Sequence, residues 1–344
     1  MGPALAHRSI LWTLFFLICM GLGYPTLNRY DPRSAPGVID SGGYYSIVLG
    51  GTDAGDESHR VLVPYLAKPI YWLANNHLHT WNPVFFALLV VNSFFIATSA
   101  SLLVVVGYRI VGDNSTAMLG AFVYLADFAV ANFNLSGMVD SAVNCLLMAL
   151  VWALLTERWW LLPVFGILGA LAKETFVPLS LVLAFTWWLT AFRRGTSRLW
   201  QLVWIAAIPL VGFVTLKFLM SMGPNPYSPL SFAASRWAES GSSSFYLSGL
   251  YRCLIAREFI YTFAWLIPLG IWRLGCLPRT WVIGSTCAAL AALVMGAYDD
   301  ALGNATRAVF SAAGPFLSLS VALFLVETGK RDSDLRTRMP ARTG

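Results

Sequence analysis

The chain has 344 residues, of which 57% are apolar, 14% aromatic and 12% charged. A soluble domain carries about 25% charged residues, so this composition excludes a soluble globular protein and indicates a polytopic membrane protein. The net charge of +6 does not indicate nucleic-acid binding, because the basic residues form short clusters between apolar runs, which is a topology signal.

The first apolar run, residues 9–27, has the length of a membrane span. His7 and Arg8 precede it as in a signal peptide, but no small-residue cleavage site follows, so we expect a retained first helix. A polar segment comes next, residues 28–60. Residues 61–73 are apolar but short, aromatic and broken by prolines, which is typical of a helix that lies at the membrane interface.

The rest of the chain predicts nine further spans, for about ten in all. Lys173 and Glu174 interrupt the apolar run of residues 161–192, and arginines flank that run on both sides, so we predict a hairpin of two short helices there. A second polar segment, residues 221–257, is rich in Pro, Ser and Gly. Single spans are predicted at residues 83–106, 117–133, 139–155, 199–220, 259–271, 281–297 and 309–326.

The expected fold class is therefore all-α, a polytopic transmembrane helix bundle. We expect residues 1–328 to form a single transmembrane domain with external loops at 28–60 and 221–257, and residues 329–344 to form a basic cytoplasmic tail. The positive-inside rule places both termini in the cytoplasm and both long polar segments outside. Most carboxylates fall on that outer side, so we expect the functional face to be periplasmic, extracellular or lumenal.

An acidic, glycine-rich loop follows the first span. It covers residues 38–45 and continues to Arg60, and its acids are Asp40, Asp53, Asp56 and Glu57. The sequence contains neither a glycine-rich phosphate loop nor a nucleophile elbow, so nothing in it indicates a nucleotide site or a serine nucleophile. Carboxylates beside the first helix indicate acid–base or metal chemistry at the outer face.

Four features, spread across most of the chain, form a pattern when they are taken together. They are Asp40 with Tyr44 and Tyr45 in the outer loop, residues 60–64, the stretch of residues 166–175 around Lys173-Glu174, and Arg307 before Pro315. This pattern resembles the GT-C superfamily of integral-membrane glycosyltransferases, which use polyprenyl-phosphate-linked sugars. Residues 166–175 are the most similar part. Many members have two adjacent acids in the first loop, whereas Ser41 follows Asp40 here.

The resemblance implies a GT-C-like fold and the transfer of a hexose or pentose from a polyprenyl-phosphate donor to a glycan, lipid or protein acceptor of the cell envelope. It implies inversion, with Asp40 as the catalytic base. Cationic groups would neutralise the departing phosphate. The substrate-binding candidates are Tyr44, Tyr45, Arg60, Lys173, Glu174 and Arg307. The candidates for orienting the acceptor or binding a divalent cation are Asp53, Asp56 and Glu57.

Simpler interpretations of the same residues remain open. Asp40 can cap a helix that starts at Ser41, since Asp is a favoured N-cap residue. Lys173 and Glu174 can form a salt-bridged helix tip, although charge inside an apolar run is usually functional. The other loop acids can be a solvated charge run, and the paired tyrosines can be interface anchors.

Asp127 lies inside a predicted span, where a carboxylate that faces lipid is costly. We expect it to form a hydrogen bond within the bundle, to Asn132 or Asn144. The other charges gather on the outer face, and no internal repeat is evident. Both observations favour the transferase over a transporter. A transporter or lipid-binding protein without catalysis, or a non-catalytic scaffold of the same fold, is the alternative function.

Overall fold

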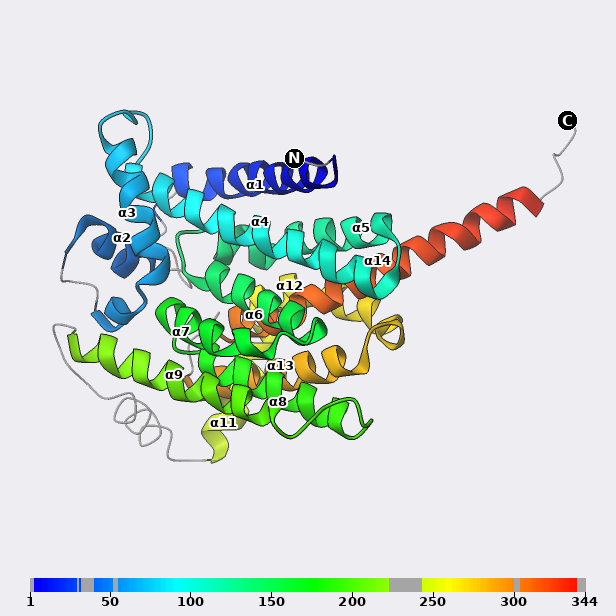
Figure 1. The fold of residues 1–344 in the computed structure, drawn as a ribbon. Helices are drawn as coiled ribbons and strands as arrows, with labels where there is room; N and C mark the ends of the chain where they lie inside the picture. Colours follow the sequence, from blue (N-terminus) through cyan, green and yellow to red (C-terminus); the bar gives the residue numbers. More distant parts are fainter. Residues whose placement is uncertain are drawn as a thin grey trace, which may run out of the picture.

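The computed structural model describes residues 3–29, 31, 40–51, 55–222, 243–299 and 304–338. Within these ranges the chain is helical and contains no strand (Figure 1). The helices long and apolar enough to cross a membrane are α1 (Pro3–Arg29), α4 (Pro83–Val111), α9 (Gln201–Met222), α13 (Arg279–Asp299) and α14 (Asn304–Arg338). A sixth span results if two helices that meet in a 70° bend cross together, namely α11 (Ser243–Ile255) and α12 (Arg257–Ile271).

This architecture agrees with the expected α-helical membrane protein, whereas helix length alone supports five or six spans rather than ten. Apolar helices that are shorter than a span are α6 (Asp140–Leu155), α7 (Leu162–Ala172) and α8 (Phe176–Phe192). The break between α7 and α8 falls at Lys173 and Glu174, as the sequence predicts. Lys173 ends α7 in an extended conformation, with φ −167° and ψ 137°, so the helix cannot continue through it.

The predicted span over residues 117–133 is interrupted in the structure. Helix α5 (Asn114–Leu125) ends early, and Asp127 Oδ1 accepts a hydrogen bond from the Ala129 backbone N–H at 2.8 Å. A side chain that satisfies a free N–H in this way starts a new turn instead of prolonging the old one. The expected partners of Asp127 were therefore wrong, and Asn132 donates to a carbonyl of its own helical turn.

The polar segment after α1 and the apolar stretch that follows it contain three helical elements within the described residues. They are α2 (Ser41–Leu49), the 3-10 helix η2 (Gly55–His59) and α3 (Leu62–Asn75). Helix α3 packs on α4 with one face and exposes Trp72 and Leu73 on another, at 67% and 74%. Exposed apolar and aromatic residues on a short helix suit the predicted position at a membrane interface.

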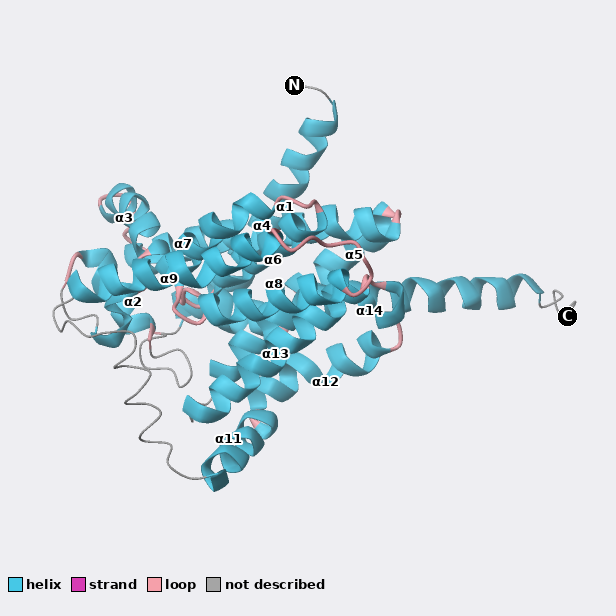
Figure 2. Cartoon of the chain, turned by 60° about the horizontal axis from the view of Figure 1, so that its bottom comes forward, coloured by secondary structure: helices cyan, strands magenta, loops and turns pink. Residues whose placement is uncertain are grey.

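The first part of helix α14 forms the centre of the bundle, and its C-terminal part extends beyond the other helices (Figure 1). Helix α14 is the most buried of the long apolar helices, and it packs against α5, α6, α12 and α13 (Figure 1). Gly107 and Gly120 let α4 and α5 approach Leu319, because a Cβ at either glycine would lie 3.1 Å from its Cδ1. Helices α1 and α11 lie at opposite edges of the bundle in two views (Figure 2).

Candidate functional site

Six ionisable side chains from distant parts of the sequence meet where α2, η2 and α3 join the bundle. We call them the charged cluster: Asp40, Arg60, Asp140, Lys173, Glu174 and Arg307. Asp40 precedes α2, Arg60 precedes α3, Asp140 begins α6, and Arg307 lies in the first turn of α14. Helix ends thus bring these groups together, while the apolar lengths of the helices stay in the core.

The inner part of the charged cluster is a buried three-residue ion network. Lys173 Nζ donates to Asp140 Oδ1 at 2.8 Å, and Arg307 Nη1 donates to Asp140 Oδ2 at 3.2 Å. The three residues are 7%, 2% and 3% exposed, in the order Lys173, Asp140, Arg307. Both carboxylate oxygens are engaged, which offsets the cost of removing the three charges from water. Asp140 therefore fixes the positions of two cations.

The outer part of the charged cluster is centred on Glu174. Its carboxylate accepts two hydrogen bonds from Arg60, from Nε at 2.9 Å and from Nη2 at 2.6 Å, and it lies 2.8 Å from His59 Nε2. Such a two-pronged contact holds a guanidinium in a defined plane. Arg60 Nη1 also donates to the Tyr44 hydroxyl at 2.8 Å, so Arg60 is positioned from two sides.

Asp40 differs from the other two acids of the charged cluster. Its Oδ2 lies 3.6 Å from Arg307 Nη2 and 3.9 Å from Arg60 Nη1, both longer than a hydrogen bond. Its side chain is 24% exposed, against 20% for Glu174 and 3% for Asp140, so its hydrogen bonding rather than its exposure sets it apart from Glu174. Helix α2 does start at Ser41, but the Asp40 side chain makes no capping hydrogen bond. The two guanidinium groups thus leave Asp40 Oδ2 without a hydrogen bond from them, and this oxygen can accept a hydrogen bond from a hydroxyl group.

The environment of the charged cluster fixes several protonation states. Burial by itself raises the pKa of Glu174, but the Arg60 charge and the hydrogen bonds from His59 and Arg60 outweigh it and hold this pKa well below its usual value. Burial lowers the pKa of Lys173, although the Asp140 carboxylate opposes that change. Burial likewise acts to lower the pKa of Arg60, yet Glu174 and Tyr44 raise it well above its usual value. Arg60 and Glu174 thus form a stable ion pair.

The structure joins most of the candidate residues in one place. Tyr45 lies elsewhere, since its hydroxyl accepts from Asn82 Nδ2 at 3.1 Å and its ring packs on Phe85 of α4. The members of the candidate set that meet at the cluster are Asp40, Tyr44, Arg60, Lys173, Glu174 and Arg307.

Only some of the predicted metal ligands lie within the described residues. Asp53 and the side chain of Asp56 lie outside the described residues, while Glu57 belongs to η2. No group of three His, Cys, Asp or Glu side chains within the described ranges is arranged to hold a metal ion. The binding of a divalent cation by the outer loop stays a prediction.

Asp140 and His59 are site residues that the sequence analysis did not select. Asp140 follows Met138 and Val139 at the start of an apolar run, and a carboxylate in that position is a signal for a buried partner. His59 directly precedes Arg60, but nothing in the sequence indicates its contact with Glu174, 115 residues away. Only the folded chain brings these groups together.

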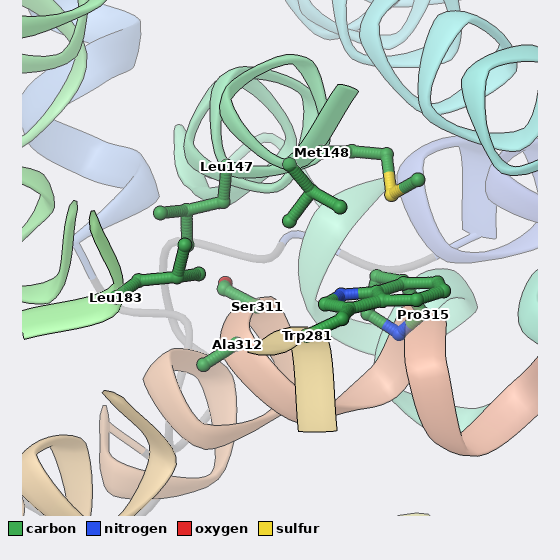
Figure 3. A pocket seen from close by; sticks show the side chains of 8 residues that line it. Leu147, Met148, Leu183, Trp281, Ser311, Ala312 and Pro315 are labelled. Carbon is green, nitrogen blue, oxygen red and sulfur yellow. The ribbon is translucent and has the colours of Figure 1, made fainter. Parts of the chain in front are cut away.

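A small apolar pocket is lined in part by Ser311, Ala312 and Pro315 of α14 (Figure 3). Ser311, whose hydroxyl donates to the Arg307 carbonyl at 2.9 Å, is one of its lining residues. Trp281 and Met148 form part of its wall. Its lining is mostly hydrocarbon, in contrast to the charged cluster.

No protein family, curated protein or solved structure matches this chain. The chemistry of the charged cluster is therefore argued from its own residues. These provide one partly exposed carboxylate that lies beyond hydrogen-bond distance from the cations, two guanidinium groups beside it, and a set of ion pairs that hold the cations in place.

Proposed function

We propose that the protein is an integral-membrane glycosyltransferase of the GT-C type, which moves a sugar from a polyprenyl-phosphate donor to an acceptor hydroxyl on the outer face of the membrane. The observation that supports this most is the position of Asp40, a partly exposed carboxylate beside Arg60 and Arg307. Sugar transfer from a lipid phosphate requires this combination, a base for the acceptor and cations for the leaving group.

The reaction would proceed in one step. Asp40 accepts the proton of the acceptor hydroxyl while the hydroxyl oxygen attacks the anomeric carbon from the side opposite the phosphate. The bond between the anomeric carbon and the phosphate oxygen breaks, and the phosphate departs with the electron pair. Configuration at the anomeric carbon is inverted, as in one-step glycosidases. Asp40 then returns its proton to water.

The guanidinium groups of Arg60 and Arg307 would bind the phosphate of the donor. Their contacts with Asp40 are long, so a phosphate oxygen can replace Asp40 beside them at little cost. The replacement would release Asp40 toward the acceptor. Glu174 and Asp140 would act as positioning residues, because they hold the two guanidinium groups in place.

The charged cluster also allows a simpler function. Buried, mutually paired charges such as Asp140 with Lys173 and Arg307 can have a structural role without any part in catalysis. A protein that binds an anionic lipid without catalysis, or that scaffolds an envelope complex, would need the same cations but no base. Whether Asp40 acts as a base therefore distinguishes the two functions.

The deciding experiment is sugar transfer in isolated membranes, measured with a panel of radiolabelled polyprenyl-phosphate sugars. We expect the wild type to transfer one sugar and Asp40→Asn to lose transfer by at least about 100-fold, the usual size of a general-base contribution. Asp113→Asn is the matched control, because Asp113 is an exposed N-cap near Lys330 at the other end of α14, and Asn caps equally well. Full transfer by Asp40→Asn would disprove the base, and no transfer by an abundant wild type would favour lipid binding.

A further inference from the structure

His59 and Arg60 are consecutive residues that both contact the carboxylate of Glu174. His59 ends η2, and Glu174 lies in the break between α7 and α8. His59 Nε2 lies 2.8 Å from Glu174 Oε2, the same oxygen that accepts a hydrogen bond from Arg60 Nε at 2.9 Å. Arg60 Nη2 donates to the other oxygen, Oε1, at 2.6 Å. The proposed reaction uses Arg60 and Glu174 but gives His59 no role.

The ionisation of Glu174 decides which side chain carries the hydrogen between it and His59. Although burial raises the pKa of Glu174, the Arg60 charge and the hydrogen bonds that Glu174 accepts hold this pKa well below its usual value, so Glu174 carries no proton. An ionised carboxylate can only accept, so His59 Nε2 carries the hydrogen and donates it. His59 is 3% exposed. It is therefore a buried donor directed at Glu174.

The hydrogen bond from His59 restricts Arg60 through Glu174. A glutamate side chain turns about several single bonds, so Arg60 and Glu174 alone can swing as a unit. The bond from His59 holds the carboxylate, and the two-pronged contact keeps the guanidinium in the same plane. Of the five N–H groups of Arg60, three donate to Glu174 and Tyr44, and another is on Nη1, 3.9 Å from Asp40 Oδ2. The plane of Arg60 decides where that N–H points.

We propose that His59 is a positioning residue, which fixes Glu174 and thereby directs the Arg60 guanidinium toward the phosphate of the lipid. The identity of that lipid, a polyprenyl phosphate, rests on the proposed function. His59 acts on the phosphate end only, because its effect passes through Arg60. Loss of the His59 hydrogen bond should therefore weaken binding of the phosphate and leave binding of the hydrocarbon chain unchanged.

The test is titration of the full-length protein in detergent with polyprenyl phosphate and with uncharged polyprenol, followed by tryptophan fluorescence. His59→Leu removes the donor and fills the buried space, so affinity for polyprenyl phosphate should fall about 10-fold, as for partners that orient metal ligands. Its affinity for polyprenol should not change. His59→Gln supplies an amide N–H in place of the ring N–H and should restore most of the affinity. His77→Leu is the matched control, since His77 is exposed.

Three results would overturn the proposal. They are equal affinity of His59→Leu and the wild type for polyprenyl phosphate, an equal loss in His59→Leu and His59→Gln, and an equal loss for polyprenyl phosphate and polyprenol. Sugar transfer by the same preparations tests the proposed function separately. A wild type that binds polyprenyl phosphate but transfers no sugar would contradict the transferase and leave the role of His59 standing.

A second measurement decides the proposal even if His59→Leu fails to fold. Nuclear magnetic resonance of the wild type with ¹⁵N-labelled histidine should show a downfield proton on His59 Nε2 that exchanges slowly with solvent, because this N–H is buried and bonded to a carboxylate. The chain has four histidines, and the signal that is missing from His59→Gln belongs to His59. Absence of such a proton from the wild type would overturn the proposal.

Discussion

Asp40 and Asp140 are both carboxylates of the charged cluster, but their surroundings give them different roles. Asp140 is buried and uses both oxygens to hold Lys173 and Arg307. Asp40 is partly exposed, and its contacts with Arg60 and Arg307 are longer than hydrogen bonds. A catalytic base must be reached by its substrate, which the buried position of Asp140 prevents.

The position of Asp40 between two guanidinium groups leads to a prediction about binding. A donor phosphate must displace the Asp40 charge from Arg60 and Arg307, so Asp40→Asn should bind polyprenyl phosphate several-fold more tightly than the wild type while it loses transfer. Titration of tryptophan fluorescence with polyprenyl phosphate measures this, with Asp113→Asn as the control. Weaker binding by Asp40→Asn would show that Asp40 is itself a ligand of the lipid.

Asp140 supports a prediction about stability. Asp140→Asn leaves Lys173 and Arg307 buried without their counter-charge, and breaking a buried network in this way costs about 3–5 kcal/mol. We expect a clearly lower melting temperature in detergent, followed by tryptophan fluorescence, whereas Asp113→Asn should melt like the wild type. If Asp140→Asn melts with the wild type, the network does not stabilise the fold.

At the residue scale, the sequence selected five of the six members of the charged cluster but did not indicate how they pair. Asp40, Arg60 and Arg307 were selected as parts of one sequence pattern that is spread across most of the chain. The contact between Arg307 and Asp140 spans 167 residues, and no local pattern encodes a pairing at that distance. Tyr45 shows the same limit, because helix geometry alone turned it from the site toward Asn82.

At the scale of single elements, hydrophobic runs predicted the helices, and local hydrogen bonds decided where they end. The break at Lys173 was visible because two charges interrupt an apolar run. The end of α5 could not be predicted in this way. We expected Asp127 to lie within a span, whereas its side chain caps the turn that follows. Capping by one carboxylate changes the local path of the chain but hardly changes the hydropathy of the segment.

Glycine residues at close helix–helix contacts lead to a prediction about stability. A Cβ at Gly249 of α11 would collide with the Ala297 carbonyl oxygen of α13, whereas a Cβ at Gly21 of α1 meets nothing within 4 Å. Gly249→Ala should therefore destabilise the protein by about 1–3 kcal/mol through overpacking. Gly21→Ala should be neutral or slightly stabilising. Thermal unfolding in detergent compares the two, and equal melting temperatures would contradict the packing of α11 on α13.

At the scale of the whole molecule, the topology predicted from basic clusters can be tested with native cysteines. Cys276 is exposed in the turn between α12 and α13, on the side assigned to the cytoplasm, while Cys19, Cys145 and Cys253 are buried. A membrane-impermeant maleimide should label Cys276 in inside-out vesicles but not in intact cells, and Cys276→Ser should abolish the signal. Labelling in intact cells would invert the predicted orientation.

The charged cluster contains three carboxylates, Asp40, Asp140 and Glu174, and three cations, Arg60, Lys173 and Arg307. Their charges sum to zero, so the cluster exerts little long-range attraction on an approaching anion. An anionic lipid would reach it by two-dimensional diffusion in the leaflet, and its capture would depend on close contact with guanidinium groups. The rate of capture should then change little with ionic strength, unlike that of a site that gathers its ligands from solution by electrostatic steering.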